Sequence, residues 1–179
     1  MTTQARLGGQ KLTRIVYSEE TIARRVDKMG REITESYTED DDLLVLGLLK
    51  GSFIFLADLV RSVDLPLQVD FLVAASYGSD TASSGDVRLV YDSDASLEGR
   101  AVIIVEDIVD SGNTLNRLVP LLSERGPKSL EICALLHKRI GPLVKEPRWV
   151  GFDAPEEFLV GYGLDFSENF RHLPYIASL

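Results

Sequence analysis

Two adjacent carboxylates and a short polar turn stand close together in the central stretch VIIVEDIVDSGNTL. Glu106 and Asp107 offer acceptors for sugar hydroxyls. Asp110 precedes the turn at residues 111–114, whose amides, hydroxyls and helix-start position favour phosphate binding. Gly112 lets the backbone approach an anion closely. The segment therefore predicts a site for a sugar phosphate.

The same residues also have a purely structural interpretation. Asp-Ser-Gly-Asn is good turn and helix-cap chemistry in proteins that bind nothing there. Acidic pairs after strands also hold Mg²⁺ in P-loop NTPases, but those need the motif GxxxxGK[ST]. Residues 47–52 are Gly-Leu-Leu-Lys-Gly-Ser, and Gly161-Tyr162-Gly163 lacks the third glycine of a dinucleotide-binding motif. The chain therefore offers neither of these two motifs.

Two further apolar segments end in polar groups. Lys50-Gly51 follows Leu43–Leu49, and His137-Lys138-Arg139 follows Ser129–Leu136. In open α/β sheets, ligands bind beyond the carboxyl ends of the strands. We therefore expect these groups to lie along one edge of a sheet, together with Glu106-Asp107.

Strand and helix patterns alternate along the chain. Strands are predicted at Leu12–Tyr17, Leu43–Leu49, Leu67–Ala75, Val87–Tyr91, Ala101–Val105 and Ser129–Leu136. Helices are predicted from a cap at Ser18 to about Ser36, over Phe53–Val63 and over Thr114–Arg125. This alternation predicts an α/β fold with a parallel twisted sheet and helices on both faces.

The 179 residues fit a single domain spanning residues 1–179. We expect a core at about residues 12–141. A small hood is expected from residues 1–17 and 142–179, because the C-terminal segment is richer in Gly, Pro and aromatic residues. No repeat or linker indicates a second domain.

Composition limits the partners and the location. A formal charge of −9 argues against a nucleic-acid partner, since such proteins need Lys/Arg patches. The single cysteine, Cys133, lies in an apolar run and is expected to be a buried small hydrophobe. No apolar stretch is long enough to span a membrane, and residues 1–11 lack the apolar centre of a secretion signal. The cytoplasm is the expected location.

The central motif resembles the phosphoribosyl pyrophosphate (PRPP) motif of type I phosphoribosyltransferases. From about Leu12 to Ile176, the chain is further similar to the bacterial type of hypoxanthine-guanine phosphoribosyltransferase, in LLVLGLLKGS, SYG, LLHKR and EEFLVGYGLDFSENFRHLPYI. The resemblance implies the type I fold with a hood. It also implies transfer of phosphoribosyl from PRPP to hypoxanthine or guanine, giving IMP or GMP and pyrophosphate in purine salvage.

The resemblance implies a role for each PRPP-binding residue. Glu106 and Asp107 would accept hydrogen bonds from the ribose hydroxyls. Pyrophosphate would meet Arg171 and a cis peptide at Leu49-Lys50, next to Gly51. Asp165 would bind Mg²⁺, with Glu106 and Asp107 as further ligands. The 5′-phosphate would be held by Asp110, Ser111, Gly112, Asn113 and Thr114, and a loop over residues 76–86, beginning with Ser76 and Tyr77, would close over the reacting centre.

The resemblance also places the base. Lys138 would donate to O6 of the purine, and Phe158 would stack on its face. Backbone groups near Leu159 would contact its edge. Asp110 would accept a proton near N7 while an oxocarbenium ion forms at the ribose.

Simpler interpretations stay open for single residues. Phe158 could be a core residue, Lys138 a solvated strand end, and Arg171 could pair with Glu168 on a surface helix. Asn113 departs from relatives that carry lysine there. The segment between Lys138 and Phe158 is one residue shorter than in the mammalian pattern.

Alternatives also stay open for the function. The chain could act on xanthine or a pyrimidine, or it could be a PRPP-sensing regulator without turnover. Such a regulator would be expected to carry a basic surface or an added DNA-binding domain. A homo-oligomer, dimer or tetramer, is implied by the family.

Overall fold

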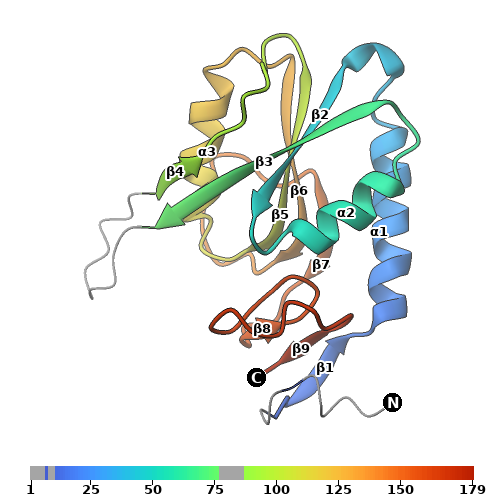
Figure 1. Cartoon of the computed structure of the whole chain (residues 1–179), viewed down its shortest axis with the longest axis vertical. Helices are drawn as coiled ribbons and strands as arrows, with labels where there is room; N and C mark the ends of the chain where they lie inside the picture. Colours follow the sequence, from blue (N-terminus) through green and yellow to red (C-terminus); the bar gives the residue numbers. More distant parts are fainter. Residues whose placement is uncertain (1–6, 8–10, 77–86) are drawn as a thin grey trace.

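A six-stranded sheet forms the centre of the molecule, in the order β4-β3-β2-β5-β6-β7 (Figure 1). The computed structural model describes residues 7, 11–76 and 87–179. The strands are β2 (Leu43–Leu49), β3 (Leu67–Ser76), β4 (Val87–Tyr91), β5 (Ala101–Val109), β6 (Ser129–His137) and β7 (Trp149–Asp153). All neighbouring pairs are parallel except β3 and β4, which are antiparallel. The predicted α/β fold with a parallel sheet is confirmed.

Helices cover both faces of this sheet (Figure 1). Helices α1 (Glu19–Thr34) and α2 (Phe53–Arg61) pack on one face, and α3 (Asn113–Ser123) packs on the other. Successive side chains of a strand point to opposite faces. Val45 of β2 accordingly joins the α1–α2 cluster, whereas Leu44 and Leu46 join the α3 cluster. This double burial explains why β2 is a continuous apolar run.

The hood is a second, smaller sheet beside the first (Figure 1). It consists of β1 (Arg14–Tyr17), β9 (Ile176–Ser178) and β8 (Leu159–Val160), paired antiparallel in the order β1-β9-β8. Its own small core contains Val160, Phe170 and Leu173. The segments that contribute these strands lie at the two ends of the chain, as expected.

One part of the expected hood lies elsewhere. We assigned all of residues 142–179 to the hood, but β7 pairs with β6 at the edge of the main sheet. Trp149 of β7 is buried there, and the Arg25 guanidinium of α1 donates to the carbonyls of Val150 and Gly151. Composition alone did not separate this edge strand from the hood.

The central strand β5 is longer than predicted. We expected it to end at Val105, yet the pairing continues, with Glu106 opposite Ala134 and Val109 opposite His137. The carboxylates at Glu106 and Asp107 therefore lie inside a strand instead of after it. Glu106 lines a pocket at this end of the strand, and neither of the two residues is fully buried.

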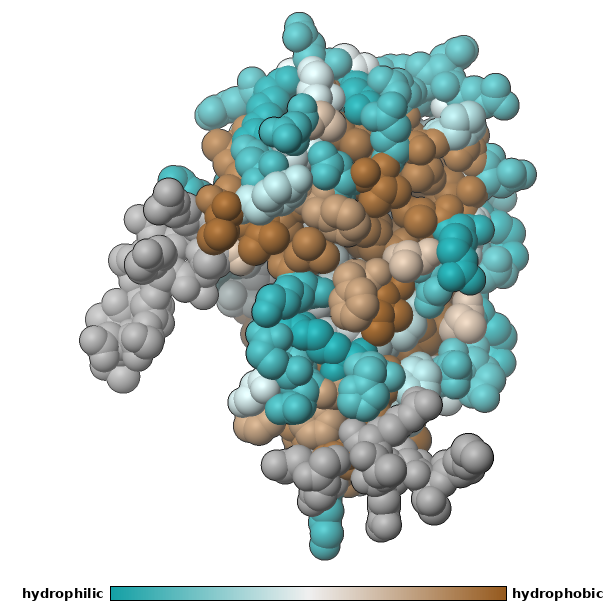
Figure 2. Space-filling view, in the orientation of Figure 1, coloured by the Kyte–Doolittle hydropathy of each residue, from teal (hydrophilic) through white to brown (hydrophobic). Residues whose placement is uncertain are grey.

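Apolar side chains gather on the main-sheet half of the face in Figure 2, and polar ones cover much of the hood. Phe53 at the start of α2 and Val69 of β3 are both exposed. Cys133 is fully buried, as predicted. Within the described part of the chain, no helix is long and apolar enough to cross a membrane.

Candidate active site

The carboxyl ends of β5 and β6 meet at one edge of the main sheet. Val109 lies opposite His137, and the backbone N–H of Lys138 donates to the Val109 carbonyl at 2.9 Å. Strand β2 runs parallel beside β5, with Gly47 opposite Val105, so Lys50-Gly51 emerges at the same edge. The predicted convergence of the three polar strand ends is confirmed.

A small pocket of about 80 Å³ lies at this edge, lined by Glu106 and by residues 108–115. Gly112 occupies the N-cap position of α3 with a φ of 78°, and no side chain caps the first amides of the helix there. A Cβ at Gly112 would stand 2.2 Å from Cδ2 of Leu143, which would have to move, and the positive φ would strain any larger residue. Uncapped amides and the positive end of a helix favour an anion. The polar turn therefore has the geometry of a phosphate site.

Glu106 lines this pocket, and Asp107 follows it in β5. Burial raises the pKa of Glu106 well above its ordinary value, and the neighbouring Asp107 charge adds to the rise. Burial also raises the pKa of Asp107, and hydrogen bonds and the positive charge of Arg171 offset only part of this rise. Oε2 of Glu106 is buried without a hydrogen-bond partner. Such an acceptor is costly unless a ligand supplies a donor or a cation.

Gly51 lies where the backbone of the hood approaches that of the main sheet. The preceding Leu49–Lys50 peptide is cis, as the family resemblance implies. A Cβ at Gly51 would stand 1.7 Å from Oδ2 of Asp107, so the carboxylate reaches its position only beside a glycine. Gly163 of the hood has a φ of 101°, and its own Cβ would stand 2.0 Å from the Gly51 carbonyl oxygen. Sequence reasoning missed Gly163, which we considered only as part of an incomplete nucleotide motif.

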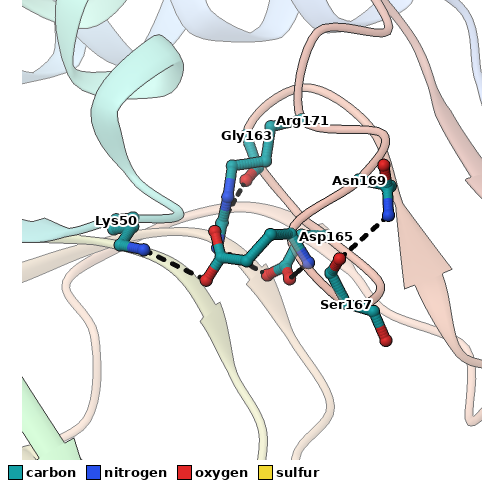
Figure 3. Close-up of polar contacts among 7 residues, drawn as sticks. Lys50, Gly163, Asp165, Ser167, Asn169 and Arg171 are labelled. Atoms are coloured by element: carbon teal, nitrogen blue, oxygen red, sulfur yellow. Dashed lines mark hydrogen bonds and ion pairs between the residues drawn. The ribbon is translucent and has the colours of Figure 1, made fainter.

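Arg171 gathers several polar groups at the hood side of the site (Figure 3). Its Nη1 donates to the Gly163 carbonyl at 2.8 Å, and its Nη2 lies 2.8 Å from Oδ1 of Asp165 and 3.3 Å from Oε2 of Glu168. Oε1 of Glu168 accepts from Nζ of Lys50 at 3.0 Å. The structure thus brings Lys50, Asp165 and Arg171 together. Glu168 does pair with Arg171, but in a turn and not on the surface helix we considered.

The residues predicted for the base occupy two places. Nζ of Lys138 lies 2.9 Å from Oδ2 of Asp110, and the Lys138 side chain is only 15% exposed, so it is not a solvated strand end. Phe158 is 56% exposed and is not a core residue. Its ring meets Phe166 edge-on, with centroids 5.7 Å apart. The Leu159 side chain is buried, which leaves only its backbone for a ligand.

Phe166 was not predicted as a site residue, because a single aromatic residue between Asp165 and Ser167 belongs to no helical or strand pattern. Ser76 ends β3, opposite Val87. Tyr77 and the rest of the predicted closing loop, to Asp86, lie outside the described residues.

No three Asp, Glu, His or Cys side chains converge as a metal site among the residues that the structure describes. Mg²⁺ is usually held by one or two carboxylates together with substrate phosphates. Asp165 and the Glu106–Asp107 pair fit that kind of site, and the unpartnered Oε2 of Glu106 is a suitable oxygen ligand.

A small pocket at an uncapped helix start and a half-buried carboxylate pair lie at the carboxyl edge of an α/β sheet, which is where such folds bind their ligands. Residues 14–167 match the family model described as phosphoribosyl transferase domain. A hypoxanthine-guanine phosphoribosyltransferase of Dictyostelium discoideum is 47% identical over 169 residues, covering 92% of this chain and 94% of the relative. A hypoxanthine phosphoribosyltransferase of Escherichia coli K12 is 46% identical over 167 residues, with the same coverage.

Solved structures agree with these relatives. The crystal structure of a hypoxanthine phosphoribosyltransferase from Staphylococcus aureus superimposes with a TM-score of 0.89 at 39% identity, covering 94% of this chain and 91% of that one. The chain therefore belongs to the phosphoribosyltransferase family, and within it to the hypoxanthine-guanine phosphoribosyltransferases.

Proposed function

We propose that this chain transfers the 5-phosphoribosyl group of PRPP to hypoxanthine or guanine, forming IMP or GMP and pyrophosphate in purine salvage. The observation that carries the proposal is the 2.9 Å contact between Nζ of Lys138 and Oδ2 of Asp110, beside the phosphate pocket. A 6-oxopurine carries an acceptor, O6, next to an N7 that can carry a proton. A donor and an acceptor side by side complement that edge.

The pocket beside this pair suits the ribose 5-phosphate. Residues 110–114 hold the phosphate through amides at the start of α3 and through the hydroxyls of Ser111 and Thr114. Glu106 and Asp107 accept hydrogen bonds from the ribose 2′- and 3′-hydroxyls. The buried and unpartnered Oε2 of Glu106 supports this assignment.

Pyrophosphate is held on the hood side by Arg171 and by the backbone at Lys50-Gly51. Mg²⁺ would be held by one or two of the carboxylates of Asp165, Glu106 and Asp107, together with oxygens of the pyrophosphate. When bound, Mg²⁺ neutralises charge on the departing pyrophosphate. Arg171 supports this part of the proposal, because its guanidinium is fixed by the Gly163 carbonyl and lies close to Asp165.

The reaction breaks the bond between C1′ and pyrophosphate and forms a bond from C1′ to N9 of the base. Asp110 takes the N7 proton as the new bond forms. Lys138 donates to O6, where negative charge grows as the base loses that proton. Phe158 stacks on the purine face, and its exposed ring, braced by Phe166, supports this role.

Pyrophosphate release tests the proposal against its alternatives. The assay uses PRPP and Mg²⁺ with hypoxanthine, guanine, xanthine, adenine and a pyrimidine in turn. Lys138 offers only donors, so adenine, which carries an amino group at position 6, should be a poor substrate. An adenine kcat/KM within about tenfold of hypoxanthine would contradict the base assignment. PRPP binding without turnover of any base would support a regulator.

The family resemblance supports a homo-oligomer, either dimer or tetramer. Phe53 of α2 and Val69 of β3 are exposed apolar side chains of the main-sheet part, which supports a partner surface there. Light scattering on the purified protein gives the number of copies.

A further inference from the structure

The carboxylate of Glu168 contacts two cations from different parts of the fold. One oxygen accepts from Nζ of Lys50 at 3.0 Å, and the other lies 3.3 Å from Nη2 of Arg171. Lys50 follows β2 in the main sheet, whereas Arg171 belongs to the hood segment. The proposed function places pyrophosphate at Arg171 and at the backbone of Lys50-Gly51, so the Lys50 ammonium belongs to a residue of that same site. The Glu168 carboxylate therefore pairs with the two cationic groups that a bound pyrophosphate would otherwise contact.

The turn that carries Glu168 is well defined. The N–H of Glu168 donates to Oδ2 of Asp165 at 2.8 Å, and Nδ2 of Asn169 donates to the Ser167 carbonyl at 2.9 Å. Phe166 and Asn169 form a β-bridge that closes the turn. Ser167 and Glu168 both have positive φ values, 50° and 63°, which is uncommon for residues other than glycine. The backbone thus holds this side chain toward Lys50 and Arg171.

We propose that Glu168 is an internal competitor of pyrophosphate, whose carboxylate must leave Lys50 and Arg171 when pyrophosphate binds and returns to them when it departs. The inference rests on the proposed function, because it takes these cations as the pyrophosphate site. Carboxylates and phosphates present similar oxygens to a guanidinium fork, so one can replace the other. A competing carboxylate weakens pyrophosphate binding and favours release of the product.

The ion pairs of Glu168 with Lys50 and Arg171 are weak enough for pyrophosphate to displace the carboxylate. Hydrogen bonds from Lys50 and then Arg171 lower the pKa of Glu168, so the carboxylate is charged at neutral pH. The Lys50 and Glu168 side chains are 65% and 66% exposed, and ion pairs in such positions are weak. Pyrophosphate carries more charge than one carboxylate and can displace it.

The test measures binding of magnesium pyrophosphate and of GMP by calorimetry, at fixed Mg²⁺ and ionic strength. Glu168→Gln keeps the shape and removes the charge, and Glu168→Ala removes the remaining hydrogen bonds as well. Both should bind pyrophosphate about two- to tenfold more tightly than the wild type. GMP, which carries no pyrophosphate, should bind within about twofold of the wild type in both.

Glu32→Gln is the matched control. Glu32 lies on α1, and its carboxylate is likewise shared by two cations, Arg25 at 3.2 Å and Lys28 at 3.8 Å. The same substitution with the same change in net charge should leave pyrophosphate affinity unchanged there. A tightening of equal size in Glu32→Gln would show a general charge effect and overturn the inference.

The remaining outcomes separate the inference from the proposed function. Weaker or unchanged pyrophosphate binding in both Glu168 variants would overturn the inference and leave the proposed function standing. Glu168 would then assist pyrophosphate binding or play no part in it. A wild type that binds no pyrophosphate and turns over no base would overturn the proposed function, and the inference with it.

Discussion

Lys138 and Asp110 form a contact of 2.9 Å between Nζ and Oδ2, although they come from the ends of two different strands, β6 and β5. The Lys138 side chain is 15% exposed and that of Asp110 is 51% exposed, so the lysine lies deeper. A buried donor thus meets an accessible acceptor. We therefore expect the two proposed roles at the purine edge, donation to O6 and removal of the N7 proton, to be performed at neighbouring points.

Asp110→Asn separates proton transfer from binding. The variant keeps the shape of the side chain and removes the base, so kcat should fall by about 10²–10⁴-fold. PRPP and GMP should bind within about threefold of the wild type. Steady-state kinetics and equilibrium binding provide the two readouts. If the substitution mainly abolishes PRPP binding, Asp110 belongs to the phosphate loop and is not the base.

Glu106→Gln should weaken nucleotide binding and stabilise the fold at high pH. Burial raises the pKa of Glu106 above its ordinary 4.5, so the folded protein holds this proton more tightly than the unfolded chain does. Stability is therefore lost as pH rises above 4.5 through the raised pKa. A neutral glutamine avoids this loss, and each kcal/mol gained raises Tm by about 2–4 °C.

Thermal unfolding at pH 8 and at pH 4 checks the sign. The Tm of Glu106→Gln should exceed that of the wild type at pH 8, and the difference should shrink at pH 4. Equal differences at both pH values would contradict the role of ionisation. Calorimetry with GMP supplies the functional readout, where affinity should fall by about tenfold for a lost charge-assisted hydrogen bond.

Gly51→Ala should damage the site through Asp107. The new methyl group would stand 1.7 Å from Oδ2 of Asp107, so the carboxylate or the backbone must move. We expect PRPP affinity to fall by at least about tenfold, with a loss of about 1–3 kcal/mol in stability from overpacking. Gly99→Ala is the control, because no atom lies within 4 Å of its Cβ position and only its positive φ adds strain. Wild-type PRPP affinity in Gly51→Ala would show that Asp107 does not need this approach.

Metal removal tests the acidic side of the site. Pyrophosphate and the nearby carboxylates repel one another, so PRPP should bind productively as its Mg²⁺ complex. Turnover should stop in excess EDTA and return when Mg²⁺ is added. Asp165→Asn should raise the Mg²⁺ concentration needed for half-maximal activity. Full turnover in EDTA would refute the metal role of Asp165.

The sequence was sufficient to predict the α/β fold, because buried parallel strands are apolar on both faces and leave a clear pattern. Leu43–Leu49 of β2 was predicted to the residue. The polar strand ends were also placed on one edge correctly, since parallel strands must bring their carboxyl ends together. These features depend on local composition and on a general rule of topology.

Other features depend on contacts that local composition does not record. The last residues of β5 are acidic, and only their pairing with β6 makes them part of a strand. Phe166 and Gly163 became visible as site residues only through their neighbours, Phe158 and Gly51. Glu168 was considered as a partner of Arg171, but its second contact, with Lys50, spans 118 residues.

The close approach of Gly51 and Gly163 has a consequence for protein engineering. With 2.0 Å between the Gly51 oxygen and the position of a Gly163 Cβ, backbone lies against backbone where the hood meets the main sheet. Because the contact is between backbones, no side-chain substitution there could compensate for a different distance between the hood and the main sheet. A hood grafted from another family member to change base preference would therefore have to carry its glycine in register with Gly51. The hood and the main sheet must therefore fit each other at this contact, and a chimera should be joined at surface loops away from Gly51 and Gly163.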